Sequence, residues 1–148
     1  MNIKLAKTAG FCFGVNRAVN TVYDLIEKGE RVCTLGPIIH NPQLVDELIQ
    51  KGVRIVSTPN EVNDGEVLVI RSHGVEQSVI DFCDNNSIRY IDATCTFVSK
   101  IHKIVNEKSR DGYVVIVAGD INHQEVKGIV GHSLGETHVI SDESELEN

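Results

Sequence analysis

Short apolar runs alternate along this chain with longer segments in which apolar residues recur every three or four positions. The short runs predict strands and the longer periodic segments predict amphipathic helices. We predict strands over residues 3–6, 31–35, 53–56, 66–71, 88–91, 113–118 and 138–140. We predict helices over residues 15–28, 42–51, 76–85, 97–110 and 125–130. This alternation is typical of the α/β class, in which helices cover parallel sheets.

The pattern nearly repeats itself after 83 positions. Cys12 and Cys95 are 83 residues apart, and each stands between a predicted strand and a predicted helix. His40 and His123 have the same separation, and a similar Ile-Val-Ser or Val-Ile-Ser run recurs at an offset of 84. Several matches in one order indicate a duplicated α/β unit. We therefore expect a first unit over residues 1–93 and a partial second unit over residues 94–148.

The second copy is shorter than the first. Counterparts of the predicted strand 66–71 and helix 76–85 do not follow it, and the last residues are acidic, as in the first turn of a helix. We expect the native protein to continue past Asn148. The alternative is a complete small protein with an acidic, frayed tail.

Composition and charge limit the classes of protein to which this chain can belong. Of the 148 residues, 41% are hydrophobic and 24% charged, which is typical of a globular protein with a buried core. The net charge of −7 argues against a nucleic-acid partner. No apolar run approaches the ~20 residues of a membrane span, and no secretion signal is apparent. We expect reduced cysteines and a cytoplasmic location.

Candidate site residues follow the predicted strands, where ligands of parallel α/β folds bind. Thiols at helix N-termini ionise readily and bind metals, whereas imidazoles suit phosphate oxygens and a carboxylate suits proton transfer. Two thiols, three imidazoles and one carboxylate share this setting: Cys12, Cys95, His40, His73, His123 and Glu125. The two cysteines have a simpler interpretation as buried small hydrophobes, and the three histidines as helix caps.

The remaining cysteines and histidines lack this setting. Cys33 lies inside a predicted strand and Cys83 on the apolar face of a predicted helix, so both are interpreted as core residues. We assign no role to His102, His132 and His138.

Five segments resemble the IspH/LytB family. They are Gly10-Phe-Cys-Phe-Gly14, Gly36-Pro-Ile-Ile-His40, Arg71-Ser-His-Gly74, Asp92-Ala-Thr-Cys95 and His123-Gln-Glu125, in order along almost the whole chain. The resemblance implies three α/β units around a [4Fe–4S] cluster, with one cysteine from each unit. It implies reduction of 4-hydroxy-3-methylbut-2-enyl diphosphate to isopentenyl and dimethylallyl diphosphate, the last step of the non-mevalonate pathway, with electrons from ferredoxin or flavodoxin.

The resemblance also implies roles for residues. Cys12 and Cys95 would bind the cluster, and a third cysteine is expected beyond residue 148. His40, His73 and His123 would line the diphosphate pocket, and Glu125 would deliver protons. Thr96 and Gln124 stand where the family usually has proline. Two alternatives stay open: a truncated, non-catalytic fragment without a cluster, and a zinc-binding module using Cys12, Cys95 and two histidines.

Overall fold

The computed structural model describes residues 2–7 and 9–147. Its helices are α1 (Phe13–Glu27), α2 (Pro42–Gln50), α3 (Gln77–Asn85), α4 (Thr96–Arg110) and α5 (Gln124–Gly131). Its strands are β1 (Arg31–Leu35), β2 (Arg54–Val56), β3 (Glu66–Ile70), β4 (Tyr90–Asp92), β5 (Val115–Ala118) and β6 (Thr137–Ile140). Two short 3-10 helices follow β2 and β6, at Pro59–Glu61 and Glu143–Glu147. Every predicted helix is confirmed within two residues at each end.

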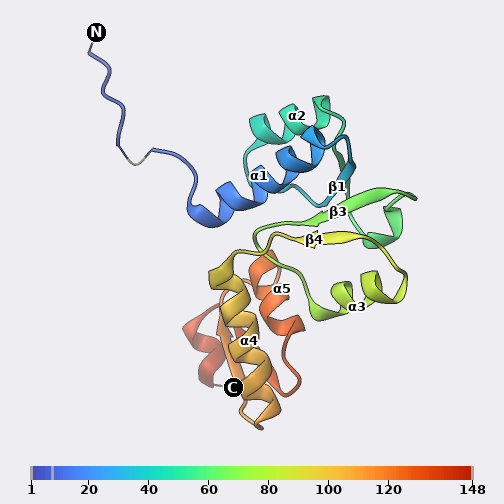
Figure 1. Cartoon of the computed structure of the whole chain (residues 1–148). Helices are drawn as coiled ribbons and strands as arrows, with labels where there is room; N and C mark the ends of the chain where they lie inside the picture. The colour runs from blue at the N-terminus through green and yellow to red at the C-terminus, as the bar shows by residue number, and fades with distance from the viewer. Residues whose placement is uncertain (1, 8, 148) are drawn as a thin grey trace.

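The first sheet is parallel, with strand order β2-β1-β3-β4. Figure 1 shows α1 and α2 on one face of this sheet and α3 on the other. Every residue of β3 is buried, as expected for a central strand covered on both sides. The continuous Val-Leu-Val-Ile run of β3 therefore reflects its place in the middle of the sheet.

Side chains alternate between two cores on either side of the first sheet. Val67 and Val69 pack beneath α1 and α2, together with Val22 of α1. Leu68 packs on the α3 side, where Cys33 and Cys83 are fully buried. Burial raises the pKa of the Cys33 thiol to about 11 and also raises that of Cys83. Both thiols are thus core residues, as predicted.

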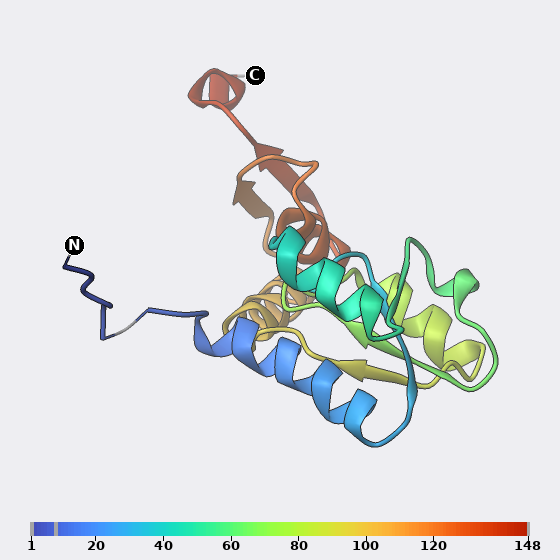
Figure 2. The ribbon, with the colours of Figure 1, turned by 90° about the horizontal axis from the view of Figure 1, so that it is seen from above.

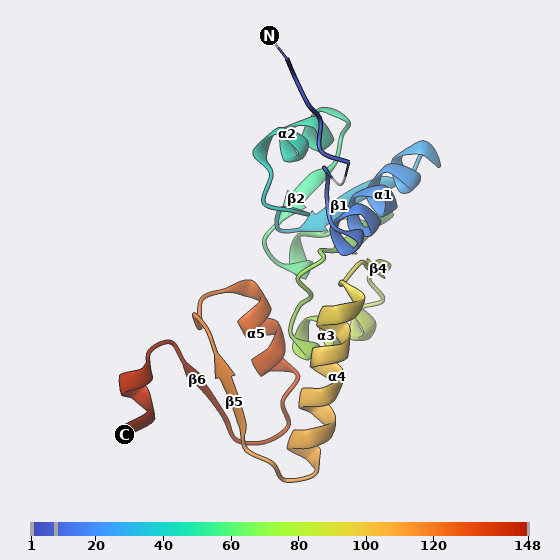
Figure 3. The same cartoon turned by 90° about the vertical axis from the view of Figure 1, so that its left-hand side faces the viewer.

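The second sheet contains β5 and β6, which pair in parallel and pack with α4 and α5 (Figure 3). Its register repeats that of the first sheet. Leu35 lies opposite Val56 in the first unit, and Ala118 lies opposite Ile140 in the second. Leu35 and Ala118 are 83 positions apart in the sequence, and Val56 and Ile140 are 84 apart. These separations match the offset of the sequence repeat.

The turn that follows each of these pairs is also repeated. The backbone N–H of Ser57 donates to the Glu61 carboxylate at 3.1 Å. The backbone N–H of Ser141 donates to the Glu145 carboxylate at 3.0 Å. In both cases a carboxylate four residues ahead closes a 3-10 turn. The repeat therefore extends from strand pairing to local hydrogen bonding.

The predicted strand at residues 3–6 is wrong. Within the described residues 2–7 the backbone forms no strand, and Ile3 and Leu5 are 81% and 88% exposed. The segment projects away from the rest of the molecule in both orientations of Figures 1 and 2. Alternation of apolar residues makes a strand possible, but a strand also needs a neighbouring backbone. No described residue provides that neighbour.

Across residues 2–7 and 9–147, no helix combines the length and the apolar character that crossing a bilayer requires.

Candidate functional site

Four of the six predicted site residues lie in loops that follow strands: His40, His73, Cys95 and His123. Glu125 lies in the first turn of α5, and Cys12 directly precedes α1 without a strand before it. Cys12 and Cys95 are the N-cap residues of α1 and α4, and His123 is the N-cap residue of α5. His40 lies between β1 and α2, and His73 follows β3. The parallel sheets therefore direct three helix N-termini and three imidazoles toward one end of the fold.

The two cysteine segments meet. A Cβ atom built on Gly14, two residues after Cys12, would lie 2.6 Å from the sulfur of Cys95. The guanidinium of Arg17 in α1 donates a hydrogen bond to the carbonyl of Thr94. Cys12 is exposed and Cys95 half-buried, and neither belongs to an apolar core. The N-terminal turns of α1 and α4 are thus held together with both thiols outside the hydrophobic interior.

Of the three predicted site histidines, His40 and His73 lie in ring contact. Their ring centroids are 4.8 Å apart and the ring planes are tilted by 49°. Burial lowers the pKa of His73, and the positive fields of His40, Arg71 and His123 lower it further, against the opposing field of Glu125. The structure therefore brings His73 into electrostatic range of the other predicted pocket residues.

His123 closes the N-terminus of α5 with its own ring. Its Nδ1 atom accepts a hydrogen bond from the backbone N–H of Glu125 at 3.3 Å. An accepting Nδ1 leaves the proton of a neutral ring on Nε2, where it is available to a ligand. His123 is exposed and Glu125 half-buried, so both can reach a molecule in the site.

Arg71 is a site residue that the sequence analysis did not single out. It directly follows β3, and its guanidinium donates to the side-chain oxygen of Gln124 at 2.5 Å. A charged residue directly after the apolar run of residues 67–70, two positions before His73, was the available signal.

His102 and His132, to which we assigned no role, are stacked with ring centroids 4.0 Å apart and 17° between ring planes. Burial, followed by the field of His132, lowers the pKa of His102 to about 4. His102 shares one face of α4 with Val98, Val105 and Ser109, and this face packs toward the interior.

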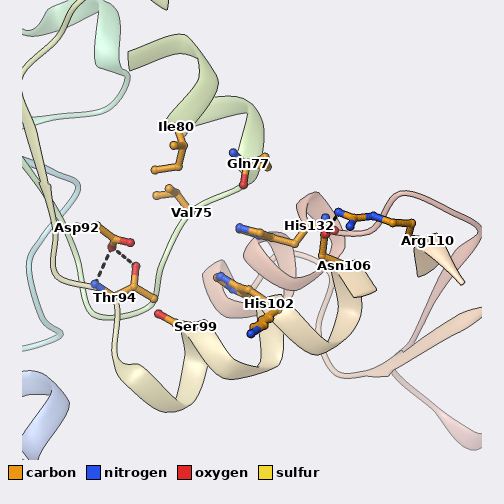
Figure 4. A pocket seen from close by; sticks show the side chains of 11 residues that line it. Val75, Gln77, Ile80, Asp92, Thr94, Ser99, His102, Asn106, Arg110 and His132 are labelled. Carbon is orange, nitrogen blue, oxygen red and sulfur yellow. Dashed lines mark hydrogen bonds between the residues drawn. The ribbon is translucent and has the colours of Figure 1, made fainter. Parts of the chain in front are cut away.

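A cavity of about 470 Å³ lies beside this stacked pair, between α3 and α4. Figure 4 shows His102 and His132 on one side of it and Val75 and Ile80 on the other. The Asp92 carboxylate accepts from the backbone N–H of Thr94 at 2.8 Å at its edge. The cavity thus lies behind the loops that carry His73 and Cys95. Its lining residues are Val75, Gln77, Ile80, Asp92, Thr94, Ser99, His102, Lys103, Asn106, Arg110 and His132.

Among the residues that the structure describes, the set of metal-binding side chains is incomplete. Within residues 2–7 and 9–147, no three side chains of His, Cys, Asp or Glu are grouped so that they could hold a metal ion. This argues against the mononuclear zinc alternative, which needs four such ligands. Two thiols whose helix N-termini adjoin fit part of a larger ligand set.

Comparison with known proteins gives one consistent family. The family model described as LytB protein matches residues 3–148. The 4-hydroxy-3-methylbut-2-enyl diphosphate reductases of Thermoanaerobacter sp. strain X514 and Geobacter sulfurreducens are 46% and 45% identical to this chain, covering 88% and 95% of it. The matches cover 47% and 49% of those two relatives.

Solved structures that resemble this chain are of the same kind of reductase. One is a structure of (E)-4-hydroxy-3-methyl-but-2-enyl diphosphate reductase, described as the terminal enzyme of the non-mevalonate pathway. It superposes with a TM-score of 0.84 at 38% identity, over 97% of this chain and 52% of that one. The E-1-hydroxy-2-methyl-but-2-enyl-4-diphosphate reductase from Plasmodium falciparum superposes with a TM-score of 0.90 at 29% identity, over 96% and 45%. The chain thus spans about half the length of the relatives it matches.

Proposed function

This chain belongs to the LytB family, and from that premise we propose that it supplies part of the active site of a 4-hydroxy-3-methylbut-2-enyl diphosphate reductase. The proposed reaction breaks the C–O bond of the allylic alcohol and forms a C–H bond. It consumes two electrons and two protons, releases water, and leaves isopentenyl or dimethylallyl diphosphate. Ferredoxin or flavodoxin would supply the electrons, in the cytoplasm.

We propose that Cys12 and Cys95 are two of the three thiolate ligands of a [4Fe–4S] cluster, and that the third comes from outside residues 1–148. Both thiols stand at helix N-termini and lie outside the apolar cores, so each can reach a bound group. When bound, such a cluster supplies one-electron transfer and a Lewis-acidic iron. The close approach of Gly14 to Cys95 supports a common centre for the two sulfurs.

His40, His73 and His123 would bind the diphosphate. The lowered pKa of His73 favours a neutral ring in the free protein, and an arriving diphosphate would raise that pKa and add charge attraction to the hydrogen bonds. His123 presents its Nε2 proton because Nδ1 already accepts from the backbone. The site would therefore bind its anionic substrate with few fixed charges, in a chain whose net charge is −7.

Glu125 would move protons to the departing hydroxyl. Its backbone is tied to the His123 ring, and it lies in the first turn of α5, within electrostatic range of His73. A carboxyl group in this position can take a proton from solvent and release it to an oxygen held at the same end of the sheet.

The observation that carries this proposal is the contact between the Cys12 and Cys95 segments, beside the loop of His73. His73 in turn lies within electrostatic range of His40 and His123. The test uses the intact protein, anaerobically, with a reduced one-electron dye and the allylic diphosphate. We expect Cys12→Ser and Cys95→Ser to lose iron, sulfide and turnover. Cys83→Ala, a buried cysteine outside the site, serves as the matched control and should keep all three. Full iron content and turnover in either serine variant would refute the ligand assignment.

A further inference from the structure

We infer that Arg71 is a positioning residue that holds His123 and Glu125 in place relative to His40 and His73 through its hydrogen bond to Gln124. The inference rests on the proposed function and adds to it a residue that contacts neither the cluster nor the substrate. Arg71 belongs to the first unit and Gln124 to the second, 53 positions away along the chain.

The first contact of the Arg71 side chain is with the turn after β1. A Cβ atom built on Gly36 would lie 2.5 Å from Nη1 of Arg71, and Gly36 has a φ of +69°. Only glycine adopts this backbone conformation readily and leaves room for the guanidinium. Gly36 begins the loop that carries His40, so the guanidinium packs on the backbone of that loop.

The second contact is with the start of α5. Nη2 of Arg71 donates to Oε1 of Gln124 at 2.5 Å, and both residues are half-buried. Gln124 is the first helical residue after the His123 cap, and Glu125 follows it. A hydrogen bond to Gln124 therefore restrains the turn that aims both neighbouring side chains.

The third connection is through the main chain, because His73 lies two residues after Arg71. One half-buried guanidinium thus touches or adjoins each of the three segments that carry the predicted pocket residues. A planar guanidinium with fixed donor directions sets such a spacing better than a flexible ammonium does. The alternative explanation is that Arg71 acts only as a positive charge near an anion.

Charge-conserving variants of the intact protein separate these explanations, with inorganic diphosphate as the probe and calorimetric titration as the readout. Gln124→Ala removes the acceptor and Arg71→Lys keeps the charge without the planar fork. We expect each to weaken diphosphate binding about five- to tenfold, as for loss of the net contribution of one hydrogen bond. The double variant should be little weaker than either single one, because both remove the same contact.

Gln124→Pro is the rescue variant. Proline is tolerated at the first helical position and fixes the backbone there without a side-chain partner. We expect Gln124→Pro to bind within about twofold of the wild type, and the His123 ring signals in NMR spectra to shift in Gln124→Ala and return in Gln124→Pro. Gln77→Ala on α3 and Arg89→Lys, both exposed, are the matched controls and should change neither readout.

Unfolding midpoints of all variants exclude a general loss of structure. If the wild type binds diphosphate and Gln124→Ala or Arg71→Lys binds equally well, the positioning role is overturned while the proposed function stands. If the wild type itself binds no diphosphate, the pocket assigned under the proposed function fails and this inference fails with it.

Discussion

Gly14 lies directly against Cys95, so that a methyl group at position 14 would overlap the sulfur. The contact joins the first turn of α1 to the N-cap of α4, and the Arg17–Thr94 hydrogen bond secures the same junction. A glycine inside a helix ordinarily costs about 1 kcal/mol relative to alanine. Its presence here is explained by the space that the second thiol needs.

Gly14→Ala is therefore expected to improve the local helix propensity and yet damage the site. The added Cβ would start 2.6 Å from the Cys95 sulfur and push α1 and α4 apart. In the intact protein, anaerobically reconstituted, we expect iron and sulfide content and the charge-transfer absorbance to fall severalfold. Asn20→Ala, on the exposed side of α1, is the control and should retain the wild-type content. Normal absorbance in Gly14→Ala would show that the two segments tolerate separation.

Residues 1–148 by themselves are expected to be inactive. They contain two of the three proposed thiolate ligands, and within the part of the chain that the structure describes no third side chain completes a metal-binding group. Anaerobic incubation with iron and sulfide should leave no stable reducible [4Fe–4S] species and no turnover of the allylic diphosphate. A brown, reducible product that turns over substrate would contradict this.

The stability of the fold should fall as the pH is lowered, in part through His102. Its folded-state pKa of about 4 lies below the ordinary value of 6.5, so the unfolded chain binds the proton more readily between these values. Stability from this residue is fully present above pH 6.5 and is lost as the pH falls toward 4. The loss amounts to about 3 kcal/mol.

Chemical denaturation between pH 4 and 7 measures this dependence. His102→Gln, which cannot titrate, should have a shallower slope than the wild type over that range. His138→Gln removes an exposed histidine paired with Glu136 and should leave the slope nearly unchanged. Equal slopes for the wild type and His102→Gln would show that His102 titrates normally in the folded state. The field of His132 lowers the pKa of His102, and the field of Asp92 raises it. Replacing either residue should therefore shift the pH at which this stability is lost.

Leu68→Ala and Leu5→Ala should differ sharply in their effect on the stability of residues 1–148. Leu68 is fully buried in β3, and removing three carbons there should cost about 3 kcal/mol of unfolding free energy. Leu5 is 88% exposed in a segment without strand pairing, so its replacement should change stability by less than about 0.5 kcal/mol. Comparable losses in thermal unfolding would mean that the N-terminal segment packs after all.

Much of the fold could be predicted from local sequence patterns. The helix of α1 could be predicted because Ala18, Val19 and Val22 recur at the spacing of one helical face. The duplication could be predicted because equivalent residues obey equivalent packing rules at a constant offset, and the shared register of Leu35 with Val56 and of Ala118 with Ile140 follows from it. The division into units at residues 93 and 94, and the roles of the six site residues, stay predictions.

The sequence by itself determined the order of strands and helices and the setting of Cys12 and Cys95 at helix starts, because periodicity and capping act over a few residues. Only the tertiary structure decided that residues 3–6 form no strand, that Arg71 reaches Gln124, and that His102 is buried against His132. Those outcomes depend on which distant backbone or side chain is adjacent in space. Strand pairing, long-range hydrogen bonds and desolvation each need a partner that no local pattern specifies.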